Sequence, residues 1–354
     1  MTKCFILYAC VIMLLSMWAC LTLWVHMPFD GLTYVVIGFI LLLSIMIIFP
    51  NYFDKLFNYF IFGELNHYSL IHQLLGVFGL IIGVVFVWFF VMTPSNDRAW
   101  QDEFKHQFTY TKNNNIITIN NVRDFYWYKD TYVKHWDVRT YDMNHLSSLD
   151  MISTTWGMDS IAHIMVSFGF DDGMGNTDRL VFSVEARKEI GEEFSTIGGF
   201  FRMYDLSIIA GDERDLIYTR TNIRNEKVSV YPILYDKQKI KNLFLAYLDY
   251  GHRLNDEPKF YHSLFSNCTT VIYKMVSQID DIPLDYRIIV SGKLADYLYD
   301  KGVIDDNYDL MDWKKAAFAN PKVAHLGNHS NTSSQQYSAL IREGLLNQDH
   351  SNKH

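Results

Sequence analysis

The sequence predicts an α+β protein in which a bundle of three transmembrane helices precedes one soluble domain. Residues 1–93 hold only five charged side chains, although 20% of the whole chain is charged. This part contains three apolar runs, and each is long enough to cross a bilayer, which takes about 20 residues. In the rest of the chain, patterns typical of strands and of amphipathic helices follow one another, as in a mixed α+β domain.

The overall charge excludes one class of protein. The chain has 31 Lys and Arg residues against 39 Asp and Glu residues, which gives a formal net charge of −8. A protein that binds the phosphate backbone depends on a positive surface. We therefore expect no nucleic-acid partner.

The apolar runs span residues 4–25, 32–50 and 70–92. None contains an Asp, Glu, Lys or Arg, so no such charge inside the membrane suggests a pump or a channel. A cleaved signal peptide is the competing interpretation of the first run. We favour a retained helix, because Trp18 is bulky where a cleavage site needs a small residue, and because the apolar run continues past Cys20.

The few basic residues of this part set the expected orientation. Lys3 precedes the first run and Lys55 lies between the second and third, so the positive-inside rule places the N-terminus in the cytoplasm. Three crossings then deliver the soluble domain to the other side, which in a bacterium is the periplasm. The loop at 51–69 is rich in Phe and Tyr; it is either an amphipathic segment in the membrane interface or an aromatic belt at two helix ends.

We divide the chain into a membrane domain (1–93), a soluble domain (94–320) and a polar, loosely ordered C-terminal tail (321–354). The segment 171–178 has the Gly, Asn and Asp content of a hairpin loop joining two strands. Strands are expected at 116–122, 162–170, 180–186 and 228–234, and helices at 238–250, 268–279 and 293–299.

Cys268 is the strongest candidate for a catalytic residue. The other cysteines, Cys4, Cys10 and Cys20, all lie in the first apolar run. An unpaired thiol in an oxidising compartment is a candidate nucleophile, although a small buried apolar residue is the alternative. Cys268 stands where a helix begins, and the free N–H groups of a helix start lower a cysteine pKa and can hold an oxyanion.

His163 is the candidate base. A lone histidine on an apolar strand is usually a core residue, but Ser183 and Glu185 share one face of the next strand, two residues apart. If the two strands pair, either side chain can orient the imidazole as the third member of a triad. We favour Glu185, because a carboxylate also stabilises the imidazolium, and keep Ser183 in reserve. No HExxH or CxxC spacing suggests a metal, and we expect no cofactor.

The order of the two candidates suggests a fold. Papain-type enzymes have the cysteine first, on a helix, and the histidine later, on a strand. Here His163 precedes Cys268, which suggests a circularly permuted papain-like domain. The Asn-Cys pair at a helix start also resembles lecithin–retinol acyltransferase, an enzyme that carries acyl groups on a cysteine.

A closer resemblance covers about residues 117–273. Seven blocks, in order, are similar to the periplasmic domain of Lnb-type lipoprotein N-acyltransferases: NNVRDFYW (120–127), YDMNHLSSLD (141–150), WGMDSIAHIMVSFGF (156–170), FSVEARKEIGE (182–192), FFRMYDL (200–206), GDERDLIYTRTNIR (211–224) and FYHSLFSNCTTVIY (260–273). The resemblance implies a permuted papain-like domain anchored in the inner membrane. It also implies Cys268 as nucleophile, His163 as base and Glu185 as the orienting residue.

The implied reaction moves an acyl chain from a membrane phospholipid, through a cysteine thioester, to the α-amino group of the diacylglyceryl-cysteine of a lipoprotein. A periplasmic cysteine hydrolase (a peptidase, amidase or lipase) and a non-enzymatic envelope scaffold are the alternatives. Guanidinium groups match phosphate geometry, so arginines are candidate lipid contacts unless they form structural ion pairs. The candidate substrate-binding residues are Asn267, Arg187, Arg202, Arg214 and Arg220.

Overall fold

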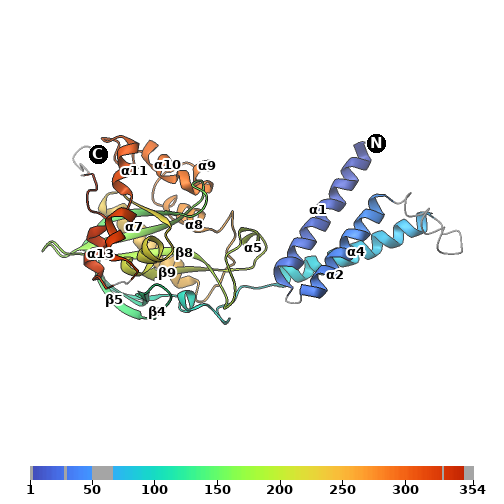
Figure 1. The fold of residues 1–354 in the computed structure, drawn as a ribbon, viewed down its shortest axis with the longest axis horizontal. Helices are drawn as coiled ribbons and strands as arrows, with labels where there is room; N and C mark the ends of the chain where they lie inside the picture. Colours follow the sequence, from blue (N-terminus) through green and yellow to red (C-terminus); the bar gives the residue numbers. More distant parts are fainter. Residues whose placement is uncertain (1–2, 28–29, 50–66, 329–330, 347–354) are drawn as a thin grey trace. The chain divides into compact units, whose positions relative to one another are not determined.

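The computed structural model describes residues 3–27, 30–49, 67–328 and 331–346 (Figure 1). The chain forms two compact units, 1–94 and 95–354, and each is described by itself below. The loop interpretation made for residues 51–69 falls almost entirely outside the described residues.

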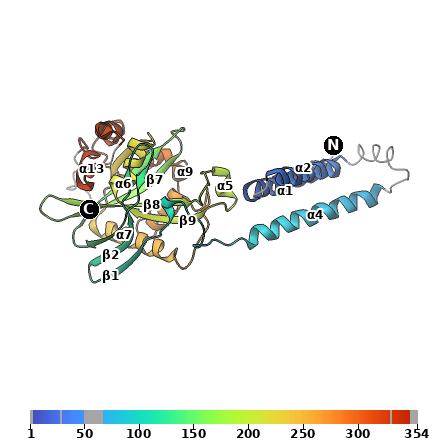
Figure 2. The same cartoon turned by 60° about the horizontal axis from the view of Figure 1, so that its bottom comes forward.

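The first unit contains three helices that are long and apolar enough to cross a membrane: α1 (Lys3–His26), α2 (Asp30–Ile48) and α4 (His67–Val91). Helices α1 and α2 lie side by side (Figure 2). Between them, the hydroxyl oxygens of Ser16 and Ser44 are 2.6 Å apart. The Trp18 ring of α1 packs against Phe86 and Phe89 of α4. Small polar groups and close packing are what hold helices together in lipid.

The second unit is built on an eight-stranded sheet with the order β1-β2-β9-β8-β7-β6-β10, and β5 pairs with β2. All neighbours are antiparallel except β2 and β9. The strands are β1 (Thr109–Asn113), β2 (Ile116–Arg123), β5 (Trp136–Asp142), β6 (Leu146–Thr155), β7 (Ala162–Asp171), β8 (Thr177–Arg187), β9 (Asp205–Gly211) and β10 (Lys227–Pro232), with a small separate ladder of β3 (Tyr126–Trp127) and β4 (Tyr132–Val133).

Helices and turns cover both faces of this sheet. They are η1 (Asp102–Phe104), α5 (Thr196–Phe200), α6 (Glu213–Leu216), η2 (Thr219–Ile223), α7 (Lys237–Arg253), α8 (Cys268–Val276), α9 (Tyr286–Ile289), η3 (Ser291–Lys293), α10 (Leu294–Asp300), α11 (Leu310–Ala317), α12 (Asn320–Val323), η4 (Ala324–Leu326) and α13 (Ser334–Leu340). The fold is therefore α+β, as the sequence predicts. That it is a permuted papain-like fold stays a prediction.

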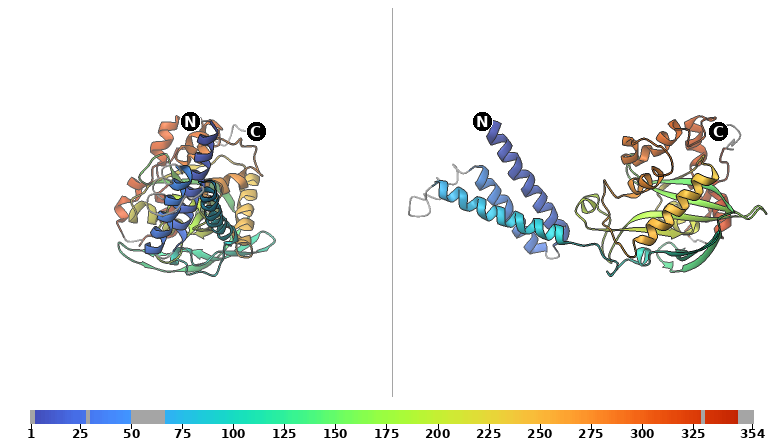
Figure 3. Two further views of the ribbon diagram at one scale, coloured as in Figure 1. Left: turned by 90° about the vertical axis from the view of Figure 1, so that its right-hand side faces the viewer. Right: turned by 180° about the vertical axis from the view of Figure 1, so that it is seen from behind.

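Strand β7 is buried from Ala162 to Phe170 because helices pack on both of its sides. Its residues Ile164, Val166 and Phe168 join the core under α7 and α8, while Met165 joins a second core with residues of α6 and α13. Figure 2 shows α6 and α13 on one side of β8 and α7 on the other, and Figure 3 shows α7 lying across its face of the sheet. His163 lies in this doubly covered strand.

The predicted loose tail after residue 320 is wrong for most of its length. Helices α12 and α13 occupy this region, and Val323, Tyr337 and Ile341 are buried in the second core. A capping box between Ser333 and Gln336 fixes the start of α13. The region is polar on average, but these few apolar residues bury enough surface to hold it against the sheet.

Candidate active site

The pairing of β7 with β8 brings His163 to its two expected partners. Met165 pairs with Ser183, and the same antiparallel register, continued by two residues, places His163 opposite Glu185. The imidazole Nε2 lies 2.7 Å from Ser183 Oγ and 3.2 Å from Glu185 Oε1. The two strands thus bring both candidate orienting residues to one nitrogen of the ring.

Glu185 is itself fixed by a chain of polar contacts. The Ser183 hydroxyl donates to Glu185 Oε1 at 2.6 Å, and Arg220 Nη2 donates to the same oxygen at 3.1 Å. The other arm of Arg220 contacts Glu226 Oε2 at 3.1 Å, and Thr154, the partner of His163 on β6, donates to that carboxylate. Each buried charge in this row therefore has an opposite charge or a hydrogen-bond donor.

Cys268 is the first residue of α8, and the sequence before it explains why the helix begins there. The Asn267 side-chain oxygen accepts from the backbone N–H groups of Thr269 and Thr270, and Thr270 Oγ1 accepts from the Asn267 N–H, which completes a capping box. The Asn267 side-chain amide also donates to Ser263 O at 2.7 Å. Asn267, expected as a substrate contact, is thus engaged in holding the helix start.

The thiol lies against the start of β7. Cys268 Sγ is 3.9 Å from the carbonyl oxygen of Ala162, the residue before His163. Ser291 fixes this point, because its hydroxyl accepts from the Ala162 N–H at 2.8 Å and donates to the Ala162 carbonyl at 2.7 Å. The next residue is Gly292, where an added Cβ would lie 2.0 Å from Asp159 O. The close approach of these two loops therefore requires glycine.

The charges of the site favour a thiolate–imidazolium pair. Burial alone lowers the pKa of His163, but the Glu185 carboxylate outweighs it and raises that pKa to about 9. Burial opposes ionisation of Cys268, but the hydrogen bond and charge of His163, with help from the Ile164 N–H, bring the pKa of the thiol below its ordinary value. Burial also opposes ionisation of Glu185, yet His163 and Arg220 hold its pKa well below the usual range.

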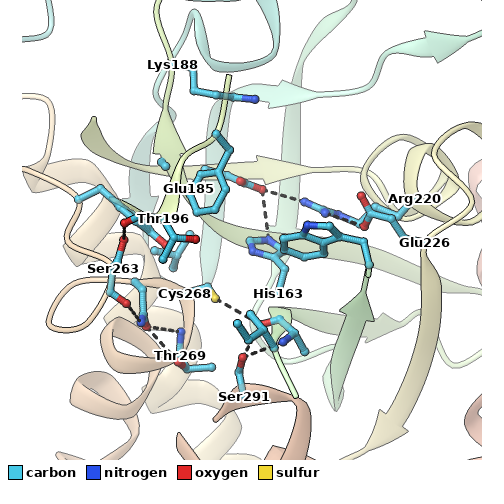
Figure 4. Close-up of a pocket in the computed structure, with 18 of the residues that line it drawn as sticks. His163, Glu185, Lys188, Thr196, Arg220, Glu226, Ser263, Cys268, Thr269 and Ser291 are labelled. Atoms are coloured by element: carbon cyan, nitrogen blue, oxygen red, sulfur yellow. Dashed lines mark hydrogen bonds and ion pairs between the residues drawn. The ribbon is translucent and has the colours of Figure 1, made fainter. Parts of the chain in front are cut away.

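The three groups open into a pocket of about 540 Å³ (Figure 4). Figure 4 shows the His163 ring between the Cys268 sulfur and the pair formed by Glu185 and Arg220. Because Nε2 is engaged by Ser183 and Glu185, Nδ1 is the ring nitrogen that can exchange a proton with the thiol. The wall combines charged groups with apolar ones, the latter including Phe104, Trp156, Met158, Ile161, Phe194 and Ile289.

The candidate phosphate-binding arginines have other contacts. Arg187 donates to the carbonyls of Phe104 and Lys105 and does not line the pocket. Arg214 is buried against Asp124, and Arg202 lies over the ring of Phe260. Neither of these lines the pocket.

Arg220 does line the pocket, but its guanidinium is shared between Glu185 and Glu226. It acts on the site by positioning Glu185. The sequence analysis gave structural ion pairs as the alternative to lipid contacts, and Arg214 and Arg220 form such pairs.

Lys188 is a pocket residue that the sequence reasoning missed. It lines the wall, and its ammonium group lies 5.2 Å from the centre of the Phe104 ring. Lys188 directly follows β8, the strand that carries Glu185. It offers the pocket a cation that can meet an anionic group. Within the described residues, no group of three or more His, Cys, Asp or Glu side chains could hold a metal ion.

The fold and site together define a membrane protein whose soluble α+β domain carries a cysteine, a histidine and a carboxylate in one pocket. Residues 132–292 match the family model of the Lnb N-terminal periplasmic domain, and this segment includes His163, Ser183, Glu185 and Cys268. This segment is therefore similar to the Lnb periplasmic domain, in line with the resemblance seen in the sequence, and it follows three helices that are long and apolar enough to cross a membrane. No curated protein and no solved structure matches the chain.

Proposed function

We propose that this protein is a lipoprotein N-acyltransferase of the bacterial inner membrane. Its acyl donor is a membrane phospholipid, and its acceptor is the α-amino group of a diacylglyceryl-cysteine at the N-terminus of a lipoprotein. The observation that carries the proposal is the contact of Cys268 with His163, with Glu185 behind the imidazole, in a pocket with a partly apolar wall. The family match and the three apolar helices support it.

The first half-reaction forms a thioester. The Cys268 thiolate attacks the ester carbonyl carbon of the donor, and a carbon–sulfur bond forms. As the tetrahedral intermediate collapses, the ester carbon–oxygen bond breaks, and the His163 imidazolium gives its proton to the departing alkoxide. A lysophospholipid leaves. The acyl chain remains on the sulfur, and His163 is neutral.

The second half-reaction regenerates the thiolate. The lipoprotein amine attacks the thioester carbonyl, and neutral His163 takes the proton that the nitrogen loses. The carbon–sulfur bond breaks and an amide forms. Glu185 keeps the ring in place and stabilises the imidazolium in both steps.

The oxyanion has one backbone donor at the helix start. The Asn267 side chain occupies the N–H groups of Thr269 and Thr270. Among the described residues, the Cys268 N–H has no hydrogen-bond acceptor, so it remains to bind the oxyanion. This refines the sequence-based expectation, which assigned the oxyanion to the helix N–H groups in general.

Lys188 is the cation that we assign to the donor phosphate. It lines the same pocket as Cys268, and the donor carries its phosphate a few bonds from the reacting ester. Lys188→Gln is expected to raise the KM for phospholipid about tenfold with little change in kcat, since an ion pair of this kind is formed in both ground and transition states.

The test is to trap the acyl-enzyme. The detergent-solubilised full chain is incubated with phospholipid labelled in its acyl chain, and a hydroxylamine-labile adduct is expected on Cys268. Cys268→Ala removes the attacking thiol, and Cys20→Ala in the first apolar helix is the matched control. Adding a diacylated lipopeptide should move the label to its amine. An adduct that only hydrolyses would identify a hydrolase, and the absence of an adduct would favour a scaffold.

A further inference from the structure

A set of exposed apolar side chains lies in the wall of the pocket and on the segments next to it. Their exposed fractions lie between 42% and 63%, which is unusual for large apolar side chains gathered at one place. We call them the apolar rim: Trp156, Met158, Ile161, Phe194, Ile197, Phe200, Phe265 and Ile289.

The rim residues line the pocket or are connected to its wall. Five of its members, Trp156, Met158, Ile161, Phe194 and Ile289, line the pocket wall directly. The other three are connected to that wall through Thr196 and Ser263, which line the pocket, and through His262. The Ser263 hydroxyl donates to Thr196 O at 2.7 Å and so joins the segments that carry Ile197 and Phe265. The His262 ring bridges Phe200 and Phe265, with centroid distances of 5.4 and 4.8 Å.

The rim lies at the end of the sheet where the chain enters the soluble unit. The Ser95 N–H donates to Asp205 Oδ2 at 2.9 Å, and Asp205 pairs with Arg187, two residues after Glu185. Residues 92–94 connect this point to the end of α4, an apolar helix long enough to span a membrane. At the opposite end of β7 and β8, the hairpin loop carries the exposed residue Met174 among Asp and Asn side chains.

We propose that the apolar rim is a membrane-contacting surface, which dips into the lipid interface and brings the pocket mouth to the acyl donor. Exposed aromatic and aliphatic side chains bind the boundary between headgroups and acyl chains, where Trp is especially favoured. A phospholipid then reaches Cys268 without exposing its acyl chain to water. That the contact delivers an acyl donor rests on the proposed function, but the contact itself can be tested without measuring acyl transfer.

Photo-crosslinking to lipid tests the contact directly. The full chain is placed in nanodiscs of phosphatidylethanolamine and phosphatidylglycerol that contain a labelled lipid. p-Benzoylphenylalanine replaces Met158 or Phe265 in the rim, or Met174 as the control; all three side chains are more than 60% exposed. We expect about tenfold more labelled lipid at 158 and 265 than at 174. Equal labelling, or labelling of only an added lipoprotein at the rim, would overturn the proposal.

A second measurement separates membrane contact from a role inside the pocket. The variant Ile197→Gln/Phe200→Gln/Phe265→Gln changes rim residues that do not line the pocket. Its acylation by bilayer phospholipid should fall about tenfold, while acylation by a water-soluble short-chain thioester stays within about twofold. Val138→Gln/Met174→Gln/Met311→Gln, at exposed sites outside the rim, should leave both rates unchanged. Equal losses with both donors would show that the rim shapes the pocket and does not contact lipid.

Discussion

Two buried charged clusters lie on the same face of the sheet, and they differ in what they do. The His163 cluster consists of His163, Ser183, Glu185, Arg220 and Glu226. The Arg342 cluster consists of Asp150, Ser167, Arg179, Glu213 and Arg342. In both, a serine of a central strand donates to a glutamate that is paired with an arginine from outside the sheet.

The two clusters differ in whether a titratable imidazole and a thiol are present. The Arg342 cluster is made of carboxylates, guanidinium groups and a serine hydroxyl, and the pKa of its Glu213 is held at about 2 by Arg342 against the effect of burial. The His163 cluster adds an imidazole whose pKa is raised to about 9, and a thiol and a pocket lie beside it. The same ionic arrangement therefore stabilises the fold at one place and positions a proton carrier at the other.

The largest expected effect comes from removing the sulfur. Cys268→Ala should lower the rate of acyl transfer by more than about 10³-fold, because the variant lacks the thiol that lines the pocket beside His163. Thermal unfolding of the same variant in detergent should match that of the parent chain, since the thiol is only partly buried. Retained acyl transfer would contradict the role of Cys268.

Removing the cation of the other cluster should affect stability and not chemistry. Arg342→Met leaves Asp150 and Glu213 buried with too little positive charge, and should cost about 3–5 kcal/mol of unfolding free energy. Denaturant unfolding in detergent measures it. The exposed pair of Lys315 with Asp312 provides the control, and Lys315→Gln should have no measurable effect. An Arg342→Met chain as stable as the parent would show that this cluster is dispensable.

Neutralising Glu185 should affect chemistry first. Glu185→Gln keeps the shape of the side chain but not the charge that stabilises the imidazolium, so acylation of Cys268 should slow by about 10²-fold. The alkaline limb of its pH profile should also move below the value of the parent chain, because Glu185 is what raises the pKa of His163. Glu213→Gln, the matched change in the Arg342 cluster, should leave that limb in place. A shift in both variants would mean that the two clusters are not separate.

The pH dependence of the parent chain follows from the same pair. Acylation requires the thiolate and the imidazolium together, so the rate should rise through the lowered pKa of Cys268 and fall above about 9. The fall should be about tenfold per pH unit, measured with a donor whose ester does not hydrolyse spontaneously. The stability of the fold should also decrease toward alkaline pH. A histidine whose pKa is raised by folding adds stability that is complete below its ordinary pKa of 6.5 and is lost as the pH rises through about 9. A rate that still rises at pH 10 would contradict the ion pair.

The smallest effect is expected at Ser183. Ser183→Ala should slow acylation only about three- to tenfold, because Glu185 Oε1 reaches His163 Nε2 directly at 3.2 Å. Ser167→Ala makes the same change in the Arg342 cluster and should leave the acylation rate unaltered. If Ser183→Ala were as slow as Glu185→Gln, the serine and not the carboxylate would be the main partner of the imidazole.

The sequence predicted the strands and side chains of the candidate site better than it predicted the parts of the fold around them. The apolar run that contains His163 and the polar turn after Phe170 were enough to expect β7 and β8, and hence the approach of His163 to Ser183 and Glu185. Strand β9 (Asp205–Gly211) was not expected from the sequence, although it is buried along its whole length. Arg220 was expected to bind phosphate, because sequence separation hides its contact with Glu185, 35 residues away. The anchoring role of Tyr337 and Arg342 was hidden for the same reason.

The position of Arg342 near the end of the described chain has a consequence for biosynthesis. Polypeptides emerge from the ribosome in order, so His163 and Glu185 appear first, Cys268 follows, and Arg342 comes after nearly all the rest. Until it arrives, the Glu213 carboxylate lacks the guanidinium that lies 2.5 Å from it, and Asp150 has Arg179 but not Arg342 as a counterion. The charge balance of this cluster is therefore complete only when the segment that carries Arg342 has folded onto the sheet.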